Sequence, residues 1–139
     1  MKHEITVDWL ENLKFDAHVE NFSFVLDGNP DSGNEEAGVR PKPLMLVALA
    51  GCSGMDVVSL LKKMRVDYKK IEIKAEGTLT DTVPAVYSAM HLIYIITGTA
   101  LPMSKITKAV SLSYEKYCGV AMMYKQFLPV TYEIRTIEG

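Results

Sequence analysis

Two cysteines, Cys52 and Cys118, are the residues of this sequence best suited to do chemistry. As a thiolate, cysteine is a strong nucleophile that can be oxidised and reduced reversibly. A second thiol within reach can close a disulfide on the oxidised one and complete a redox cycle. The alternative is that each thiol simply packs in the core, since free cysteine is among the most buried residue types.

The bulk properties of the 139-residue chain favour reduced thiols over a disulfide scaffold. Residues 1–7 alternate in character and lack the apolar centre of an export signal, so we expect a cytoplasmic protein. A net charge of −2 gives no reason to expect nucleic acid or a membrane as partner. The three histidines show no metal-ligand spacing, so no metal site is expected.

Cys52 lies in the middle of an apolar run, residues 43–61, in which Asp56 is the only charge. Apolar residues fall on every side of this run, which for a helix predicts burial all round. The run is too short, and too soon followed by lysines, for a membrane span. Small residues flank Cys52, and we therefore expect a second helix to cross this one at the cysteine.

A thiolate on Cys52 needs help from a cation. The cysteine lies more than two turns inside its helix, where the helix dipole no longer acts, and Asp56 one turn further disfavours a second negative charge. Arg40 and Lys42, at the entrance of the helix, are our candidates for activating the thiolate or binding substrate. Each could equally be an ordinary solvated charge.

The surrounding pattern predicts a single α+β domain over residues 1–139. Alternating apolar residues predict three N-terminal strands, followed by a polar loop at residues 27–38 and a helix that begins near Pro43. Two further strands are expected at residues 68–76 and 89–97. A second helix then runs from about residue 102 to Cys118, with Gly119 as its C-cap. A short helical turn at residues 120–124 and a strand at residues 130–137 complete the prediction.

The segments around both cysteines carry a family resemblance. Residues 40–58, with Ala-Leu-Ala-Gly-Cys ending at Cys52 and Met-Asp-Val-Val after it, resemble the first-cysteine helix of the OsmC/Ohr family, the osmotically inducible protein C and organic hydroperoxide resistance proteins. Residues 113–118, Ser-Tyr-Glu-Lys-Tyr-Cys, resemble the second signature. The resemblance covers residues 5–137.

The resemblance implies an OsmC-like fold, with antiparallel sheets wrapped around two central helices in an intertwined homodimer. It also implies a thiol peroxidase of the oxidative stress response that reduces organic hydroperoxides or other small apolar substrates. Cys52 would be the peroxidatic thiol and Cys118 the resolving thiol. No bound cofactor is expected, and an external dithiol would regenerate the enzyme.

The sequence departs from the peroxidase branches in its charged residues. Those branches carry a glutamate ten residues before the first cysteine, where this chain has Lys42, and an arginine in the N-terminal strands, where this chain has none. The chain therefore resembles a divergent branch. The alternative function is a catalytically weak protein of the same fold that binds a small molecule or senses redox state.

Overall fold

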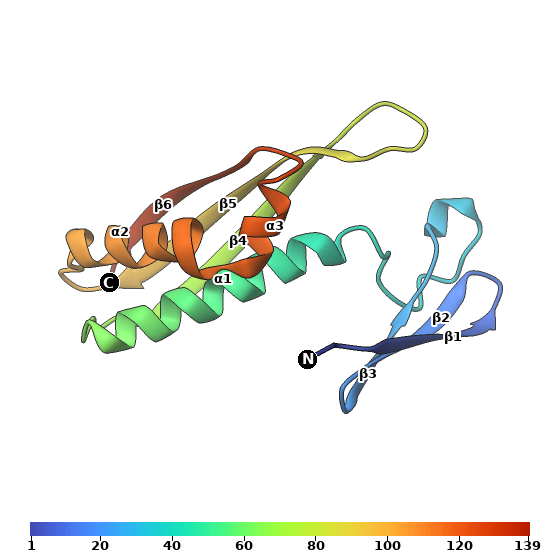
Figure 1. The fold of residues 1–139 in the computed structure, drawn as a ribbon, viewed down its shortest axis with the longest axis horizontal. Coiled ribbons are helices and arrows are strands. Elements are labelled where there is room, and N and C mark those ends of the chain that lie inside the picture. The colour runs from blue at the N-terminus through green and yellow to red at the C-terminus, as the bar shows by residue number, and fades with distance from the viewer. The chain divides into compact units, whose positions relative to one another are not determined.

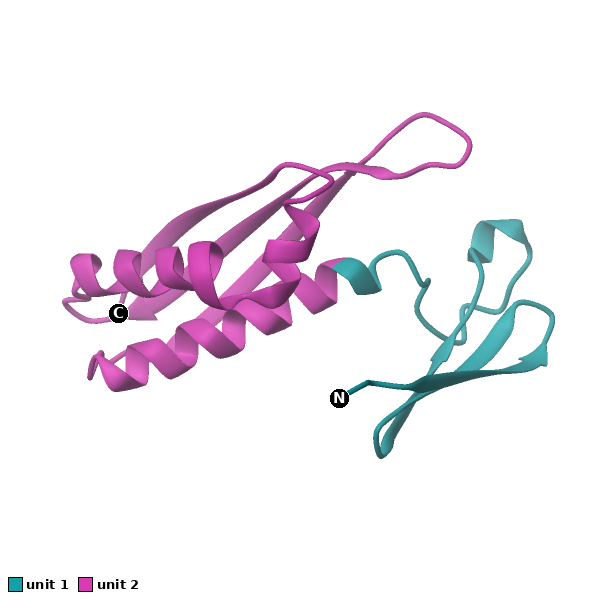
Figure 2. Cartoon of the chain, in the orientation of Figure 1, with its two compact units in different colours: residues 1–45 teal, residues 46–139 magenta.

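The computed structural model describes residues 1–139. The chain forms two compact units, residues 1–45 and residues 46–139, and each is described by itself (Figure 2). The first unit contains a three-stranded sheet, and the second contains another three-stranded sheet with three α-helices (Figure 1). The mixed α+β class predicted from the sequence is confirmed.

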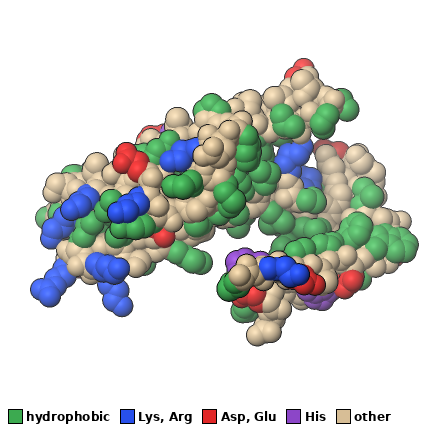
Figure 3. Space-filling model, in the orientation of Figure 1, with side chains coloured by type: hydrophobic (Ala, Val, Ile, Leu, Met, Phe, Trp, Pro, Cys, Tyr) green, Lys and Arg blue, Asp and Glu red, His purple; other side chains and the backbone are tan.

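The N-terminal unit is an antiparallel meander of β1 (Ile5–Glu11), β2 (Lys14–Val19) and β3 (Phe22–Leu26), as predicted. The register places every apolar residue of the alternating pattern on one face, because directly paired residues share a face. Much of this face is exposed in the single chain: Trp9 retains 65% and Phe22 74% of their accessible surface. Figure 3 shows hydrophobic side chains at the surface of this unit.

Within the predicted loop at residues 27–38, the Asp27 side chain forms hydrogen bonds to the loop backbone. This buried carboxylate accepts hydrogen bonds from the backbone N–H of Gly28, at 2.7 Å, and of Ala37, at 3.0 Å. A short 3₁₀ turn, Pro30–Ser32, lies between these contacts. Gly38 passes so close to the Val25 carbonyl that a Cβ there would clash with it.

α1 (Leu44–Lys63), of which all but the first two residues belong to the second unit, starts one residue after Pro43, as the sequence predicts. The sheet of the second unit has the order β4 (Lys70–Leu79), β5 (Tyr87–Gly98), β6 (Val130–Glu138). β4 and β5 are antiparallel, whereas β5 and β6 are parallel. The prediction of antiparallel sheets is therefore wrong for β6, because the helices between β5 and β6 return the chain to the end where β5 began.

The core of the second unit lies between β5 and the helices. Alternate residues of β5 are almost fully buried, namely Met90, Leu92, Tyr94 and Ile96. They face α1, whose buried residues recur every fourth position: Leu49, Ser53, Val57 and Leu61. Gly54 approaches β4 closely, since a Cβ there would meet the Ile73 side chain at 2.8 Å.

The opposite side of α1 is exposed in the single chain. Val47, Met55 and Val58 are 63%, 77% and 43% exposed, and their spacing places them along one stripe of the helix. The prediction that this helix is buried all round is therefore wrong for the chain alone. Apolar composition predicts that a surface is covered, but it does not show that the same chain supplies the cover.

The second predicted helix is interrupted before Cys118. α2 (Met103–Leu112) passes into a single π-helical turn, Ser113–Tyr117, and Cys118 itself has an extended backbone. Gly119 is then the first residue of α3 (Gly119–Tyr124), so its predicted role as a C-cap is wrong. Cys118 caps α3 instead, because its Sγ accepts the backbone N–H of Ala121 at 3.3 Å.

Candidate functional site

The fold brings the two cysteines together. The sulfur atoms of Cys52 and Cys118 and a carboxylate oxygen of Asp56 all lie within 4.8 Å of one another. Cys52 is half-buried, whereas Cys118 is only 1% exposed. The proximity that a redox pair requires is therefore present, and one of the two thiols is reachable from solvent.

Local structure explains how each of the three groups reaches the cluster. Cys52 and Asp56 are four residues apart on α1, so their side chains lie one turn apart on the same face. Cys118 belongs to a different part of the chain and lies at the break between the π-helical turn and α3. π-helical turns occur frequently at functional sites, where they redirect a side chain that a regular helix would point elsewhere. The predicted helix crossing at Cys52 thus involves this break.

Three buried hydroxyl groups form a hydrogen-bond network next to the cluster. The Ser113 hydroxyl donates to the Asp56 carboxylate at 3.1 Å and lies 3.0 Å from the Ser53 hydroxyl. The Ser53 hydroxyl is also hydrogen-bonded to the hydroxyl of Tyr94. All three hydroxyl-bearing residues are at most 1% exposed. The network joins α1, β5 and the π-helical turn, and it fixes the position of the carboxylate beside the thiols.

The surroundings favour a protonated Cys118. Burial, the largest cause, and the neighbouring Cys52 thiol and Asp56 carboxylate together raise the pKa of this thiol to about 11, although the Ala121 N–H acts in the opposite direction. Burial also raises the pKa of Tyr94 to about 12. At neutral pH, Cys118 is therefore a neutral thiol that must lose its proton during any reaction.

This shift makes the stability of the reduced protein depend on alkaline pH. Because the native state holds the Cys118 proton more tightly than the unfolded chain does, stability is full below the ordinary pKa of 9.0 and is lost as pH rises towards about 11. The loss should amount to roughly 2 kcal/mol of unfolding free energy. Urea unfolding between about pH 8 and pH 11 measures it.

Cys118→Ser is the control for this pH dependence, since serine keeps an acceptor for the N-terminus of α3 but does not titrate in this range. The variant should lose less stability than the wild type over the same pH interval. The remaining loss comes from groups such as Tyr94, whose pKa is also raised. Equal losses in the two proteins would show that Cys118 does not carry the effect.

A cavity of about 340 Å³ opens beside the cluster. It is lined by Asp56, Ser59, Leu60, Lys63 and Tyr117, so it combines a carboxylate, a cation and apolar walls. From the sequence alone, Lys63 is recognisable only as a cation in the last turn of the helix, where it interacts favourably with the helix dipole. Its spacing of seven residues from Asp56, two helical turns, is the signal that places both on one face.

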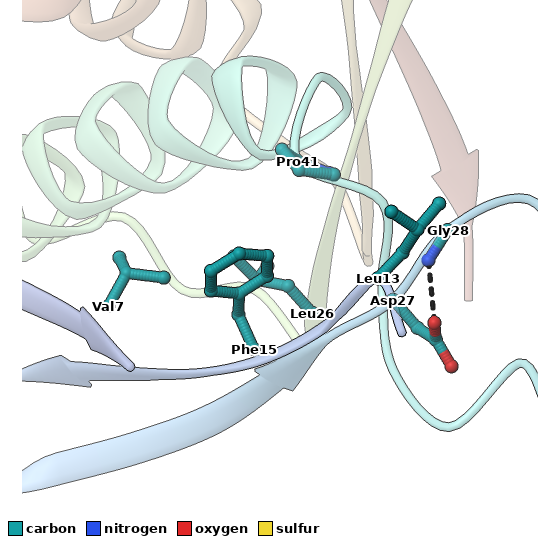
Figure 4. A pocket seen from close by; sticks show the side chains of 7 residues that line it. All are labelled: Val7, Leu13, Phe15, Leu26, Asp27, Gly28 and Pro41. Carbon is teal, nitrogen blue, oxygen red and sulfur yellow. Dashed lines mark hydrogen bonds between the residues drawn. The ribbon is translucent and has the colours of Figure 1, made fainter. Parts of the chain in front are cut away.

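The predicted cations Arg40 and Lys42 belong to the other unit. Both line a cavity of about 580 Å³ there, together with Asp27 and Met45. A second cavity of about 370 Å³ shares three of its lining residues and has apolar walls that include Phe15 (Figure 4). The role of Arg40 and Lys42 at the thiols stays a prediction.

Glu35, in the loop at residues 27–38, forms an ion pair in the N-terminal unit. Its carboxylate lies 2.7 Å from the ammonium group of Lys14. Among the predicted residues, the structure therefore places Cys52, Cys118 and Asp56 in one cluster. The residues that sequence reasoning missed there are Ser53, Tyr94, Ser113, Lys63 and Tyr117.

Comparison with known proteins gives consistent matches over nearly the whole chain. The sequence pattern described as "OsmC-like protein" matches residues 32–133. Protein YhfA of Escherichia coli K12 is 33% identical over 132 residues, which cover 94% of this chain and 96% of that protein.

Solved structures agree with this match. A hypothetical protein from Aquifex aeolicus VF5 is 27% identical, with a TM-score of 0.82 over 99% of this chain and 98% of its own. An organic hydroperoxide resistance protein OsmC from Legionella pneumophila has a TM-score of 0.72 at 13% identity, with 97% of each chain covered. At that identity, the likeness concerns the fold.

Proposed function

The chain belongs to the OsmC-like protein family, and on that premise we propose that it is a thiol-dependent peroxidase that reduces organic hydroperoxides. The observation that carries the proposal is the placement of two reduced thiols within 4.8 Å of each other, next to a carboxylate, Asp56, that also lines a cavity. A structural neighbour from Legionella pneumophila is an organic hydroperoxide resistance protein, which supports this substrate class.

In the proposed reaction, the Cys52 thiolate attacks the outer oxygen of the hydroperoxide. The O–O bond breaks, the alkoxide takes a proton and leaves as an alcohol, and Cys52 becomes a sulfenic acid. The Cys118 thiol then attacks the Cys52 sulfur, forms a disulfide and releases water. An external dithiol reduces this disulfide by exchange and is itself oxidised to a disulfide, which restores both thiols.

The different burial of the two thiols supports this division of roles. Cys52 is half-buried, so a peroxide can reach it, whereas Cys118 is almost completely covered. A raised pKa keeps Cys118 protonated and therefore unreactive until the sulfenic acid forms beside it. The apolar walls of the cavity at Asp56, supplied by Leu60 and Tyr117, suit a small organic substrate.

We expect a cation near Cys52 to favour its reactive thiolate form. Lys63 lines the same cavity as Asp56 and is the candidate within this unit. Arg40 and Lys42 are the candidates from the N-terminal unit, and either could come from a partner subunit. The peroxidase branches carry an arginine in the N-terminal strands that this chain lacks, so the source of the positive charge would differ here.

A redox sensor is the second candidate function. The observation in its favour is the carboxylate of Asp56, which lies close to both thiols and contributes to the raised pKa of Cys118. Such a site would be oxidised slowly and would report oxidant rather than remove it. Its disulfide would form from the same two cysteines.

We propose that the protein acts as a homodimer in the cytoplasm. One face of the N-terminal meander and one stripe of α1 are apolar and exposed in the single chain, and a second copy would cover them. By length and composition alone, α1 could cross a membrane. Because α1 packs its other face against β5, we assign it to the protein core.

Steady-state consumption of cumene hydroperoxide, with a dithiol as reductant, tests the proposed function. The wild-type protein should consume peroxide catalytically, and the Cys52→Ser variant should show no more than the rate of the dithiol alone, because the nucleophile is gone. A wild-type rate equal to that of Cys52→Ser would overturn the peroxidase proposal. Slow formation of the disulfide without turnover would favour the sensor.

A further inference from the structure

We propose that Cys52, Cys118 and Asp56 of the reduced protein form a binding site for a thiophilic divalent cation, of which Zn²⁺ is the physiological example. The sequence alone led us to expect no metal, since the histidines lack ligand spacing. The structure places two sulfur ligands and one oxygen ligand from distant parts of the chain around a common point.

The distances suit a zinc ion after a small contraction. Two sulfur atoms, each about 2.3 Å from a tetrahedral zinc ion, lie roughly 3.8 Å apart. The three ligand atoms here are already within 4.8 Å of one another. A shift of about 1 Å by side-chain rotation of the half-buried Cys52 would close the site.

The surroundings of the ligands have the features of a metal site. The Ser113 hydroxyl donates to the Asp56 carboxylate, and the Ala121 N–H donates to the Cys118 sulfur. Such outer contacts orient ligands and stabilise the negative charge that they carry when bound. Asp56 also lines a cavity, from which water could approach the carboxylate side of the site as a fourth ligand.

The types of ligand select the metal. Thiolates prefer soft or borderline ions such as Zn²⁺ and Cd²⁺, whereas Mg²⁺ and Ca²⁺ prefer sites made of oxygen ligands alone. Binding of Zn²⁺ releases the two thiol protons and leaves the oxidation state of the sulfur unchanged. A disulfide between Cys52 and Cys118 would remove both thiolates, so the oxidised protein should not bind.

Metal binding would regulate the site. A thiolate held by Zn²⁺ cannot attack a peroxide with the same electron pair, so the ion would protect the reduced protein from oxidation. This consequence rests on the proposed peroxidase function, whereas the binding itself does not.

The test is a titration of the reduced full-length protein with Zn²⁺ against a chromogenic chelator. One equivalent per chain should bind, and Cd²⁺ should give a thiolate charge-transfer band in the ultraviolet. Cys52→Ser, Cys118→Ser and Asp56→Asn should each weaken binding by more than the roughly 10- to 100-fold typical of losing an outer contact. Asp67→Asn, at an exposed carboxylate outside the cluster, should bind as the wild type does.

A second arm separates this inference from the proposed function. The disulfide form, prepared with diamide so that no peroxidase activity is needed, should fail to bind Zn²⁺. Undiminished Zn²⁺ binding by Cys52→Ser or by the disulfide form, or no binding by the reduced wild type, would overturn the inference, even if peroxide is consumed. Binding by the reduced wild type that needs all three residues would support it, even if no peroxide is consumed.

Discussion

The Cys118→Ser variant should take up one oxygen atom per chain from an organic hydroperoxide and then stop. Without a dithiol present, Cys52 forms the sulfenic acid, and no thiol lies nearby to resolve it. The product should be heavier by about 16 Da and should react with dimedone, which traps sulfenic acids. The wild-type protein should instead pass to the disulfide and give no dimedone adduct.

The double variant Cys52→Ser/Cys118→Ser is the control for this experiment, since it keeps both side-chain volumes nearly unchanged and carries no thiol. It should gain no mass. A disulfide-linked pair of Cys118→Ser chains would show that Cys52 reacts across two molecules. An unmodified Cys118→Ser protein after prolonged exposure would contradict the peroxidatic role of Cys52.

Charges on the exposed stripe of α1 should convert the proposed dimer to monomers. Met55→Glu/Val58→Glu places two carboxylates where 77% and 43% exposed apolar side chains now lie. Burying an unpaired charge in an interface costs several kcal/mol per ion, which exceeds what two apolar contacts contribute. Light scattering at micromolar concentration should give about twice 15.5 kDa for the wild type and 15.5 kDa for the variant.

Ser104→Glu/Thr107→Glu is a matched control for the stripe. It adds the same two charges, three residues apart, on the exposed side of α2. We expect this variant to keep the dimeric mass. A monomeric wild type would contradict the proposal that a second copy covers the stripe, and dissociation of both variants would assign the effect to net charge.

The strands of the N-terminal meander could be predicted because one face of each is apolar and the other polar. The direction of β6 could not, since a strand has the same pattern whichever way it runs. The π-helical turn before Cys118 also gives no local signal, because residues 113–117 are compatible with a regular helix. The break is stabilised by tertiary contacts, which include the buried Ser113 hydroxyl.

The residues of the candidate site could likewise be predicted only in part. Cys52 and Asp56 could be paired from their spacing on a helix, and Cys118 could be added through the family resemblance. Ser53 and Tyr94 could not be recognised, because their hydrogen bond joins residues 41 positions apart on different elements. A buried serine in an apolar helix is a weak signal of such a network, since its hydroxyl needs a partner.

The intact mass and free-thiol count of the reduced wild-type protein, before and after one equivalent of cumene hydroperoxide, test directly whether Cys52 and Cys118 form a peroxide-reactive pair. Both thiols should be lost rapidly, with a mass decrease of about 2 Da, as expected for a disulfide between Cys52 and Cys118. Two thiols that remain free, with unchanged mass, after many minutes would contradict the claim that these cysteines form a peroxide-reactive pair.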